Sequence, residues 1–155
     1  MKKQQSGFTM IELIMVIVIL GILAAFALPR FADFSGDARL STVSGALGAA
    51  RSAAAIAHAA QLSAGDAGNV AVTLEGATIN MINGYPAATA DVAGANAGGI
   101  MVAAQLSDDF EGTVAANGAL TVQLASAPAG CAFTYTAAVA DGAPVFAGPV
   151  DGACD

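Results

Sequence analysis

One acidic residue, Glu12, lies near the start of a long apolar run that extends from Phe8 to Leu28. The run is long enough for a helix to cross a bilayer core of about 30 Å. A carboxylate inside such a segment costs on the order of 2.5–3.5 kcal/mol, and the run contains no basic residue that neutralises it. We therefore predict that Glu12 meets a positive group on another copy of the chain and serves self-assembly.

A short polar segment precedes the run and carries Lys2 and Lys3, on the side that the positive-inside rule assigns to the cytoplasm. A secretory signal has its small-residue cleavage site after the apolar stretch, whereas here the small residue, Gly7, comes before it. Cleavage between Gly7 and Phe8 would keep the apolar helix on the mature protein and create a new α-amino group close to Glu12. The amine of an incoming subunit is the partner that we expect for Glu12.

Two cysteines, Cys131 and Cys154, lie late in the chain. A metal site needs more ligands, and the one histidine, His58, lies on another predicted element; a redox site would contain Cys-x-x-Cys, which the sequence lacks. In a protein whose body lies outside the cytoplasmic membrane, an even pair indicates a disulfide. We predict a disulfide that ties the C-terminal tail to the domain, and a structural or exposed role for His58.

The segment from Gly7 to Leu13, Gly-Phe-Thr-Met-Ile-Glu-Leu, resembles the class III signal of type IV pilins and of the related type II secretion pseudopilins. The resemblance implies that a prepilin peptidase cuts after Gly7 and methylates the new amino terminus at Phe8. It places Glu12 at the acidic position of this family. The motif is specific because leader charge, glycine, aromatic residue, acid and apolar run must all coincide.

Gly21 and Pro29 fall where these proteins carry helix-breaking residues, so the resemblance implies a break in the helix there. Pro29 removes a backbone donor and crowds the preceding turn. We expect a continuous or kinked helix in the isolated subunit and a loosened stretch over residues 24–28 in a filament.

Shorter matches in the remainder of the chain, Asp37-Ala38-Arg39, Asn83-Gly84-Tyr85-Pro86 and Cys131-x-Phe-x-Tyr, resemble pilins of the mannose-sensitive haemagglutinin type. Type IV pilins carry a C-terminal disulfide loop that major pseudopilins commonly lack, so the cysteine pair favours a pilin. The resemblance implies a structural subunit of an extracellular type IV pilus, for adhesion, motility or biofilm formation. The alternative is a pseudopilin that forms a short periplasmic piston.

The implied partners are further copies of the chain in a helical homopolymer, the prepilin peptidase and the pilus assembly machinery. The precursor would lie in the bacterial inner membrane and the mature subunit in a pilus on the cell surface. The chain is 56% hydrophobic and 11% charged, and loss of Lys2 and Lys3 with the leader shifts its formal charge from −7 to −9. Such a surface offers no electrostatic track for nucleic acid. No catalytic group can be assembled from the sequence, so we expect neither an enzyme nor a cofactor.

The predicted fold class is α+β, with a long N-terminal helix, a small antiparallel β head and a C-terminal disulfide loop. Residues 1–7 form the cleaved leader, 8–28 the transmembrane and filament-core helix, 29–64 its amphipathic continuation, and 65–155 the head. We predict that the continuation has two apolar faces, which pack on different partners. The face toward the head contains Val43, Leu47, Ala50, Ala54 and Ala57; the face toward neighbouring subunits contains Phe31, Phe34, Ala38, Ala49, Ala53, Ile56 and Ala60.

In the head the hydrophobic pattern changes toward the alternation of β-strands. We predict strands at residues 70–74, 78–82, 119–124, 131–136 and 144–146, a turn at 83–86 and a short helix at 99–106. In the 131–136 strand, Cys131, Phe133 and Tyr135 should face the core. Asp108, Asp109 and Glu111 cluster in a predicted loop, where a solvated turn is favoured over a calcium site.

Overall fold

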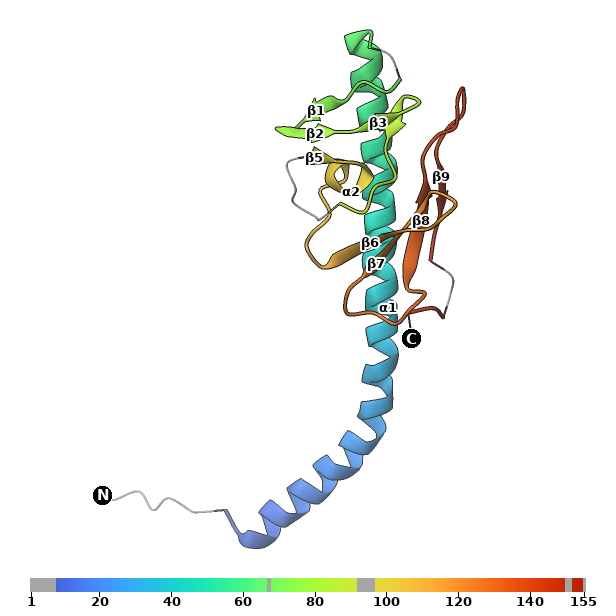
Figure 1. Cartoon of the computed structure of the whole chain (residues 1–155). Coiled ribbons are helices and arrows are strands. Elements are labelled where there is room, and N and C mark those ends of the chain that lie inside the picture. Colours follow the sequence, from blue (N-terminus) through green and yellow to red (C-terminus); the bar gives the residue numbers. More distant parts are fainter. Residues whose placement is uncertain (1–7, 67, 92–96, 150–151, 155) are drawn as a thin grey trace, which may run out of the picture. The chain divides into compact units, whose positions relative to one another are not determined.

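The computed structural model describes residues 8–66, 68–91, 97–149 and 152–154. One long helix is followed by a head of short strands (Figure 1). The chain divides into two compact units, Met1–Ser35 and Gly36–Asp155. The helices are α1 (Met10–Ala64) and α2 (Ile100–Ala103); the strands are β1 (Val72–Leu74), β2 (Ala77–Ile79), β3 (Met81–Ile82), β4 (Tyr85–Pro86), β5 (Ala97–Gly98), β6 (Phe110–Val114), β7 (Ala119–Leu124), β8 (Ala132–Thr136) and β9 (Val145–Ala147).

Within the second unit, α1 buries one face, and this face contains all five residues predicted to pack on the head: Val43, Leu47, Ala50, Ala54 and Ala57. The predicted outward face is wrong for Ala53, which is 7 % exposed because it lies three residues from Ala50, on the margin of the buried face. Phe34 and Ile56 are exposed as predicted, and the side chain of Phe31 lies outside the described residues.

The largest sheet has four antiparallel strands in the order β6-β7-β8-β9. Strand β7 has the predicted bounds, and β8 and β9 lie within one residue of theirs. Strand β6 was predicted as a loop, and Glu111 lies within it, paired with Gln123 of β7. Its signal in the sequence is weak because Gly112 interrupts the alternation. A Cβ at position 112 would lie 2.6 Å from Met101 Sδ and 3.2 Å from the Cα of Ala90, so a larger residue there would displace its neighbours.

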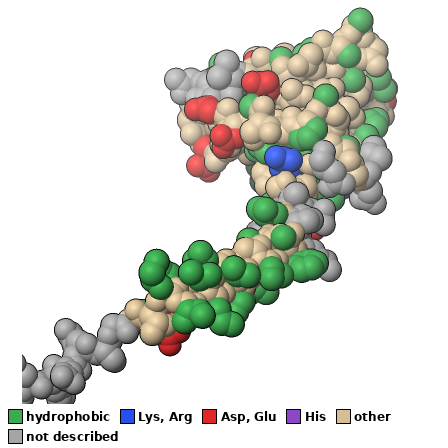
Figure 2. Space-filling model, turned by 90° about the horizontal axis from the view of Figure 1, so that it is seen from below, with side chains coloured by type: hydrophobic (Ala, Val, Ile, Leu, Met, Phe, Trp, Pro, Cys, Tyr) green, Lys and Arg blue, Asp and Glu red, His purple; other side chains and the backbone are tan. Residues whose placement is uncertain are grey.

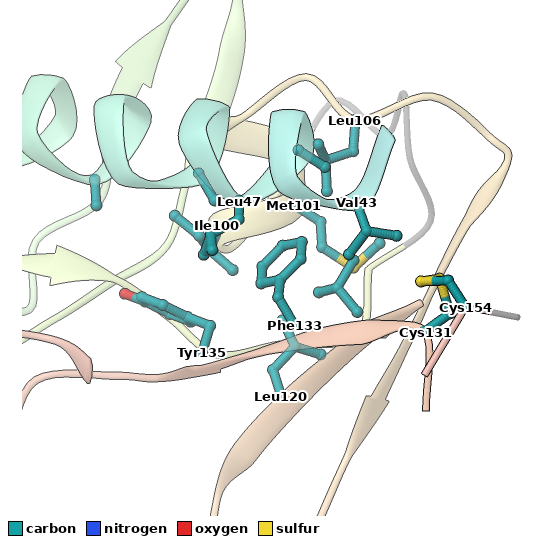
Figure 3. Packing of buried hydrophobic residues seen from close by; sticks show 14 residues of the cluster. Val43, Leu47, Ile100, Met101, Leu106, Leu120, Cys131, Phe133, Tyr135 and Cys154 are labelled. Atoms are coloured by element: carbon teal, nitrogen blue, oxygen red, sulfur yellow. A yellow bond between two sulfur atoms is a disulfide. The ribbon is translucent and has the colours of Figure 1, made fainter. Parts of the chain in front are cut away.

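The core lies between the four-stranded sheet, α1 and α2 (Figure 3). Phe133 and Tyr135 project from β8 onto these helices, and Cys131, Phe133 and Tyr135 are buried as predicted. Full burial of a large apolar side chain contributes roughly 1.5–3 kcal/mol. The hydroxyl of Tyr135 donates to the carbonyl oxygen of Pro86 at 2.5 Å, and burial raises the pKa of Tyr135. The buried hydroxyl is thus paired, as a polar group in a core must be.

A smaller sheet has the order β1-β2-β5, in which β2 and β5 pair in parallel, and β3 and β4 form a separate pair. The predicted strand at 78–82 is therefore two strands of different sheets. Two-residue turns close the hairpins, Glu75-Gly76 and Asn83-Gly84, with positive φ at all four residues. This is the geometry of type I′ turns, which match the twist of paired strands. The predicted turn at 83–86 is confirmed for Asn83 and Gly84.

The predicted helix at 99–106 forms only over Ile100–Ala103. Gln105 N–H bonds the Val102 carbonyl and Leu106 N–H bonds the Met101 carbonyl, so the helix ends in a Schellman motif. Gln105 takes the left-handed position of this motif with a φ of 51°, where glycine is usual.

Candidate functional site

The N-terminal part of α1 exposes its large apolar side chains. Met10–Leu28 is long and apolar enough to cross a membrane, by length and composition, and none of it is buried. Phe8 is 88 % exposed and Phe26 is 76 % exposed. Figure 2 shows hydrophobic side chains gathered along this part of the helix. An apolar surface of this extent marks a contact with lipid or with other protein chains.

Glu12 lies in the first turn of α1 and closes a capping box with Thr9. Glu12 Oε2 accepts hydrogen bonds from the Thr9 backbone N–H at 2.9 Å and from the Thr9 hydroxyl at 2.7 Å. The Glu12 N–H donates to Thr9 Oγ1 at 3.3 Å. Such a reciprocal pair satisfies donors that a helix start leaves without partners, and a carboxylate is favourable at this end of the helix dipole.

The capping box pairs the oxygen of Glu12 but does not neutralise its charge. Among the described residues, the Glu12 carboxylate forms hydrogen bonds with Thr9 and no ion pair. The pattern Thr9-x-x-Glu12 in the sequence already indicates this local role, beside the role predicted from the charge of Glu12. Glu12 therefore keeps the capacity to bind a cation from outside its own chain while it fixes the start of the helix.

Of the other residues predicted to act in processing and helix breaking, Gly7 lies outside the described residues, and Phe8 is the first residue that the structure describes. Helix α1 runs through Gly21 and Pro29, and the side chain of Pro29 lies outside the described residues. A Cβ at Gly21 would meet no atom within 4 Å, so no described contact of this chain requires glycine there. Cleavage, methylation and the loosening of the helix stay predictions.

A disulfide joins Cys131 to Cys154, and both cysteines are buried in the main core. Arg39 of α1 donates from Nη1 to the carbonyl oxygen of Cys154 at 3.3 Å. The C-terminal segment is thus held to the head by a covalent bond and by a hydrogen bond from the long helix. The role of Arg39 was not predicted, because nothing in its local sequence indicates a partner so distant along the chain.

His58 has a structural role, which was one of the two that the sequence left open. Its Nδ1 lies 2.7 Å from the carbonyl oxygen of Gly84, and because a carbonyl oxygen only accepts, Nδ1 carries the hydrogen. The imidazole stacks on the ring of Tyr85, with the ring centroids 4.2 Å apart and the planes 6° apart. His58 therefore fastens the β3–β4 turn to α1.

The acidic cluster at Asp108, Asp109 and Glu111 is divided between a turn and strand β6, which corrects the predicted single loop. No three His, Cys, Asp or Glu side chains in the described ranges are arranged to hold a metal ion. Within those ranges the cluster has the exposure of a solvated surface.

Two comparisons with known proteins bear on these sites. Residues 2–28 match the family model of the prokaryotic N-terminal methylation motif. The chain is 33% identical to the type IV major fimbrial protein FimA of Dichelobacter nodosus over 118 residues, which cover 75% of this chain and 72% of that protein.

Two further relatives match over about a third of the chain. The type IV narrow pilus major component PilA5 of Thermus thermophilus is 55% identical over 52 residues, 34% of this chain and 45% of its own length. The type IV major alpha-pilin of Moraxella bovis is 51% identical over 49 residues, 32% of this chain and 31% of its own length. The chain thus spans less than half the length of these two relatives. No solved structure gives a significant match.

Proposed function

The chain belongs to the type IV pilin family, and from this premise we propose that it is the structural subunit of an extracellular type IV pilus. The observation that carries the proposal is the uncovered apolar surface of Met10–Leu28, with the single acid Glu12 in its first turn. In the membrane, lipid covers this surface; in the filament, the same segments of other copies cover it. The apolar segment thus accounts for the location of the subunit in the membrane before assembly and in the filament after it.

In this proposal the precursor lies in the inner membrane with Lys2 and Lys3 on the cytoplasmic side. Prepilin peptidase cuts between Gly7 and Phe8 and methylates the amine of Phe8. The pilus assembly machinery then transfers the subunit from the bilayer to the base of the filament. The match of residues 2–28 to the methylation motif supports the processing step of this proposal.

Glu12 guides assembly in this proposal by binding the amine of an incoming subunit. A wrong stagger between neighbouring helices would leave two charges unpaired in apolar surroundings, which is costly. The capping box with Thr9 supports this role, because it holds the carboxylate at a fixed place in the first turn. Pairing of charges therefore selects the correct register.

The alternative function is a pseudopilin in a type II secretion system. The disulfide between Cys131 and Cys154 and the names of the relatives, which are a pilus component, a pilin and a fimbrial protein, favour the pilus. The same names favour a structural role over a catalytic one.

The test is to shear filaments from cells and measure the intact mass of their main protein. We expect the mass of a chain that starts at Phe8 and carries one methyl group. This mass should be lower by two hydrogens than that of the chain with two free thiols, because the disulfide has formed. A bulky replacement of Gly7, such as Gly7→Val, should leave the full precursor in the membrane. A mature chain that starts after Leu28, or the absence of this protein from sheared filaments, would refute the proposal.

A further inference from the structure

A groove of about 800 Å³ lies on one flank of the head. The outer face of α1, the β1–β2 turn and the end of α2 form its walls. Its lining is mostly small and apolar, and among the described residues that line it Glu75 alone is charged. A ligand that fits this lining presents a cation beside apolar atoms.

The β1–β2 turn fixes the position of Glu75. The residue has a φ of 50° and Gly76 a φ of 83°, as a type I′ turn requires, and the turn joins two paired strands. Within the described residues, Glu75 has no hydrogen bond or ion pair through its side chain. The groove therefore presents an unpaired carboxylate on a short and defined turn.

An exposed cation, Arg51, lies on the other flank of the head. With 3.6 residues per turn, Arg51 projects from α1 roughly away from Ala49, Ala53 and Ile56, which line the groove. Its guanidinium carbon lies 5.8 Å from the centre of the Phe146 ring, in a cation–π contact. Figure 1 shows β1 and β2 on one side of α1 and β8 and β9 on the other.

Basic side chains such as that of Arg51 are few in this chain. Lys2 and Lys3 belong to the predicted leader, the side chain of Arg30 lies outside the described residues, and Arg39 already donates to the Cys154 carbonyl. Among the described residues, Arg51 forms no ion pair. An exposed arginine held by an aromatic ring on a strongly acidic protein is placed to meet an acid of another molecule.

We propose that the guanidinium of Arg51 binds Glu75 in the groove of the neighbouring copy of this chain. The two surfaces differ and lie on opposite flanks of one head, so the contact is heterologous. Repeated contacts of this kind build an open helical array where the rotation between copies does not close into a ring, whereas a closed two-fold dimer needs the same patch on both partners. The inference rests on the proposed filament and names a contact between its heads, separate from the apolar helices.

Charge reversal tests the pair in cells that carry the full-length protein. Arg51→Glu and Glu75→Arg should each lower the amount of sheared filament about tenfold, and the double variant should recover most of the loss, because it restores opposite charges. Glu111→Arg is the matched control, since Glu111 is an exposed acid outside the groove, and it should leave the filament unchanged. Immunoblots of the membrane fraction report the amount of folded subunit.

A cross-link gives a second and direct measurement. The mature chain retains no lysine once Lys2 and Lys3 are removed, so Arg51→Lys introduces its one side-chain amine. A zero-length carbodiimide should then join position 51 of one subunit to Glu75 of the next, in a peptide identified by mass spectrometry. Filaments of Arg51→Lys in which position 51 joins another acid or none, or single reversals that assemble like the wild type, would overturn the pair. Wild-type cells whose filaments lack this protein would instead refute the proposed function.

Discussion

Between Met10 and Leu28, α1 is apolar and buries none of its side chains, whereas between Val43 and Ala57 the same helix buries one face in the core of the head. The first segment is lined by large residues, such as Phe26 and Leu28. The residues that the second segment buries in the head are alanines and two larger residues, Val43 and Leu47. One continuous helix thus carries two kinds of apolar surface, distinguished by side-chain size.

The difference shows which of the two apolar surfaces the chain buries by itself and which it leaves exposed. The small side chains of Ala50, Ala54 and Ala57 allow close packing of the strands and α2, and the buried clusters of the head form within one molecule. The large side chains of the first segment have no partner in the described residues of their own chain. Folding of the head should therefore not depend on the apolar segment, and variants of Met10–Leu28 should leave the head folded.

The largest effect should follow from removal of the charge at Glu12. Glu12→Gln keeps an oxygen that accepts from Thr9, but it carries no charge and cannot form an ion pair with an amine. Sheared filaments should therefore fall tenfold or more, which corresponds to at least about 1.4 kcal/mol per contact. Processed subunit should accumulate in the membrane with a folded head, as judged by resistance to protease.

Thr9→Val is the matched control for Glu12→Gln. It removes the hydroxyl of the capping box and keeps the carboxylate, at a cost of about 1 kcal/mol to the helix start. Filaments should persist at close to wild-type amounts, because the backbone N–H of residue 9 still donates to Glu12 Oε2 and holds the carboxylate in place. If Thr9→Val abolished filaments and Glu12→Gln did not, capping and not charge would be the assembly function of Glu12.

The next effect concerns the head. Replacement of both cysteines by serine, Cys131→Ser with Cys154→Ser, should lower the free energy of unfolding by roughly 3 kcal/mol, because the reduced chain gains freedom when it unfolds. Thermal unfolding of the detergent-solubilised subunit measures the loss, and near-wild-type stability would show that packing and Arg39 alone hold the tail. Membrane insertion through Met10–Leu28 should not change.

A smaller effect comes from Tyr135. Tyr135→Phe leaves the carbonyl of Pro86 without its donor and should cost about 1–3 kcal/mol at neutral pH. Burial, with a further contribution from Tyr85, raises the pKa of Tyr135 in the folded state, so folding favours the neutral phenol. The stability from this group is complete below the unfolded pKa of about 10 and is lost as the pH rises above it. Denaturant titrations from pH 8 upward should show this alkaline loss in the wild type and a smaller one in the variant.

The smallest predicted effect has the opposite sign. Gln105 holds a φ of 51° at the end of α2, so Gln105→Gly should relieve backbone strain and raise the free energy of unfolding by about 1 kcal/mol. Chemical denaturation would detect a higher midpoint. A lower midpoint would mean that contacts of the Gln105 side chain outweigh the strain.

The sequence predicted the elements whose patterns are regular. Strand β7 was placed at its observed bounds because Ala119–Leu124 alternates without interruption, and the inward residues of β8 follow from the same rule. The buried face of α1 was likewise correct, because its spacing follows the helical period. These features depend on local periodicity, which a single sequence records.

The features that the sequence did not predict depend on distant partners. Strand β6 forms because β7 pairs with it, although Gly112 breaks its alternation. The parallel pairing of β2 with β5 and the contact of Arg39 with Cys154 have no local signal. The capping box of Thr9 and Glu12 is a local motif that the sequence contains. The prediction for Glu12 was instead an ion pair with another copy of the chain, because it was based on the charge of Glu12.

The disulfide between Cys131 and Cys154 closes part of the head into a covalent ring. The connection between β8 and β9 lies inside this ring and contains the exposed residues Val139 and Asp141. A protease that cuts this connection therefore hydrolyses one peptide bond without releasing a fragment. A nicked subunit keeps both pieces in place, and only reduction of the disulfide frees the C-terminal piece from the ring.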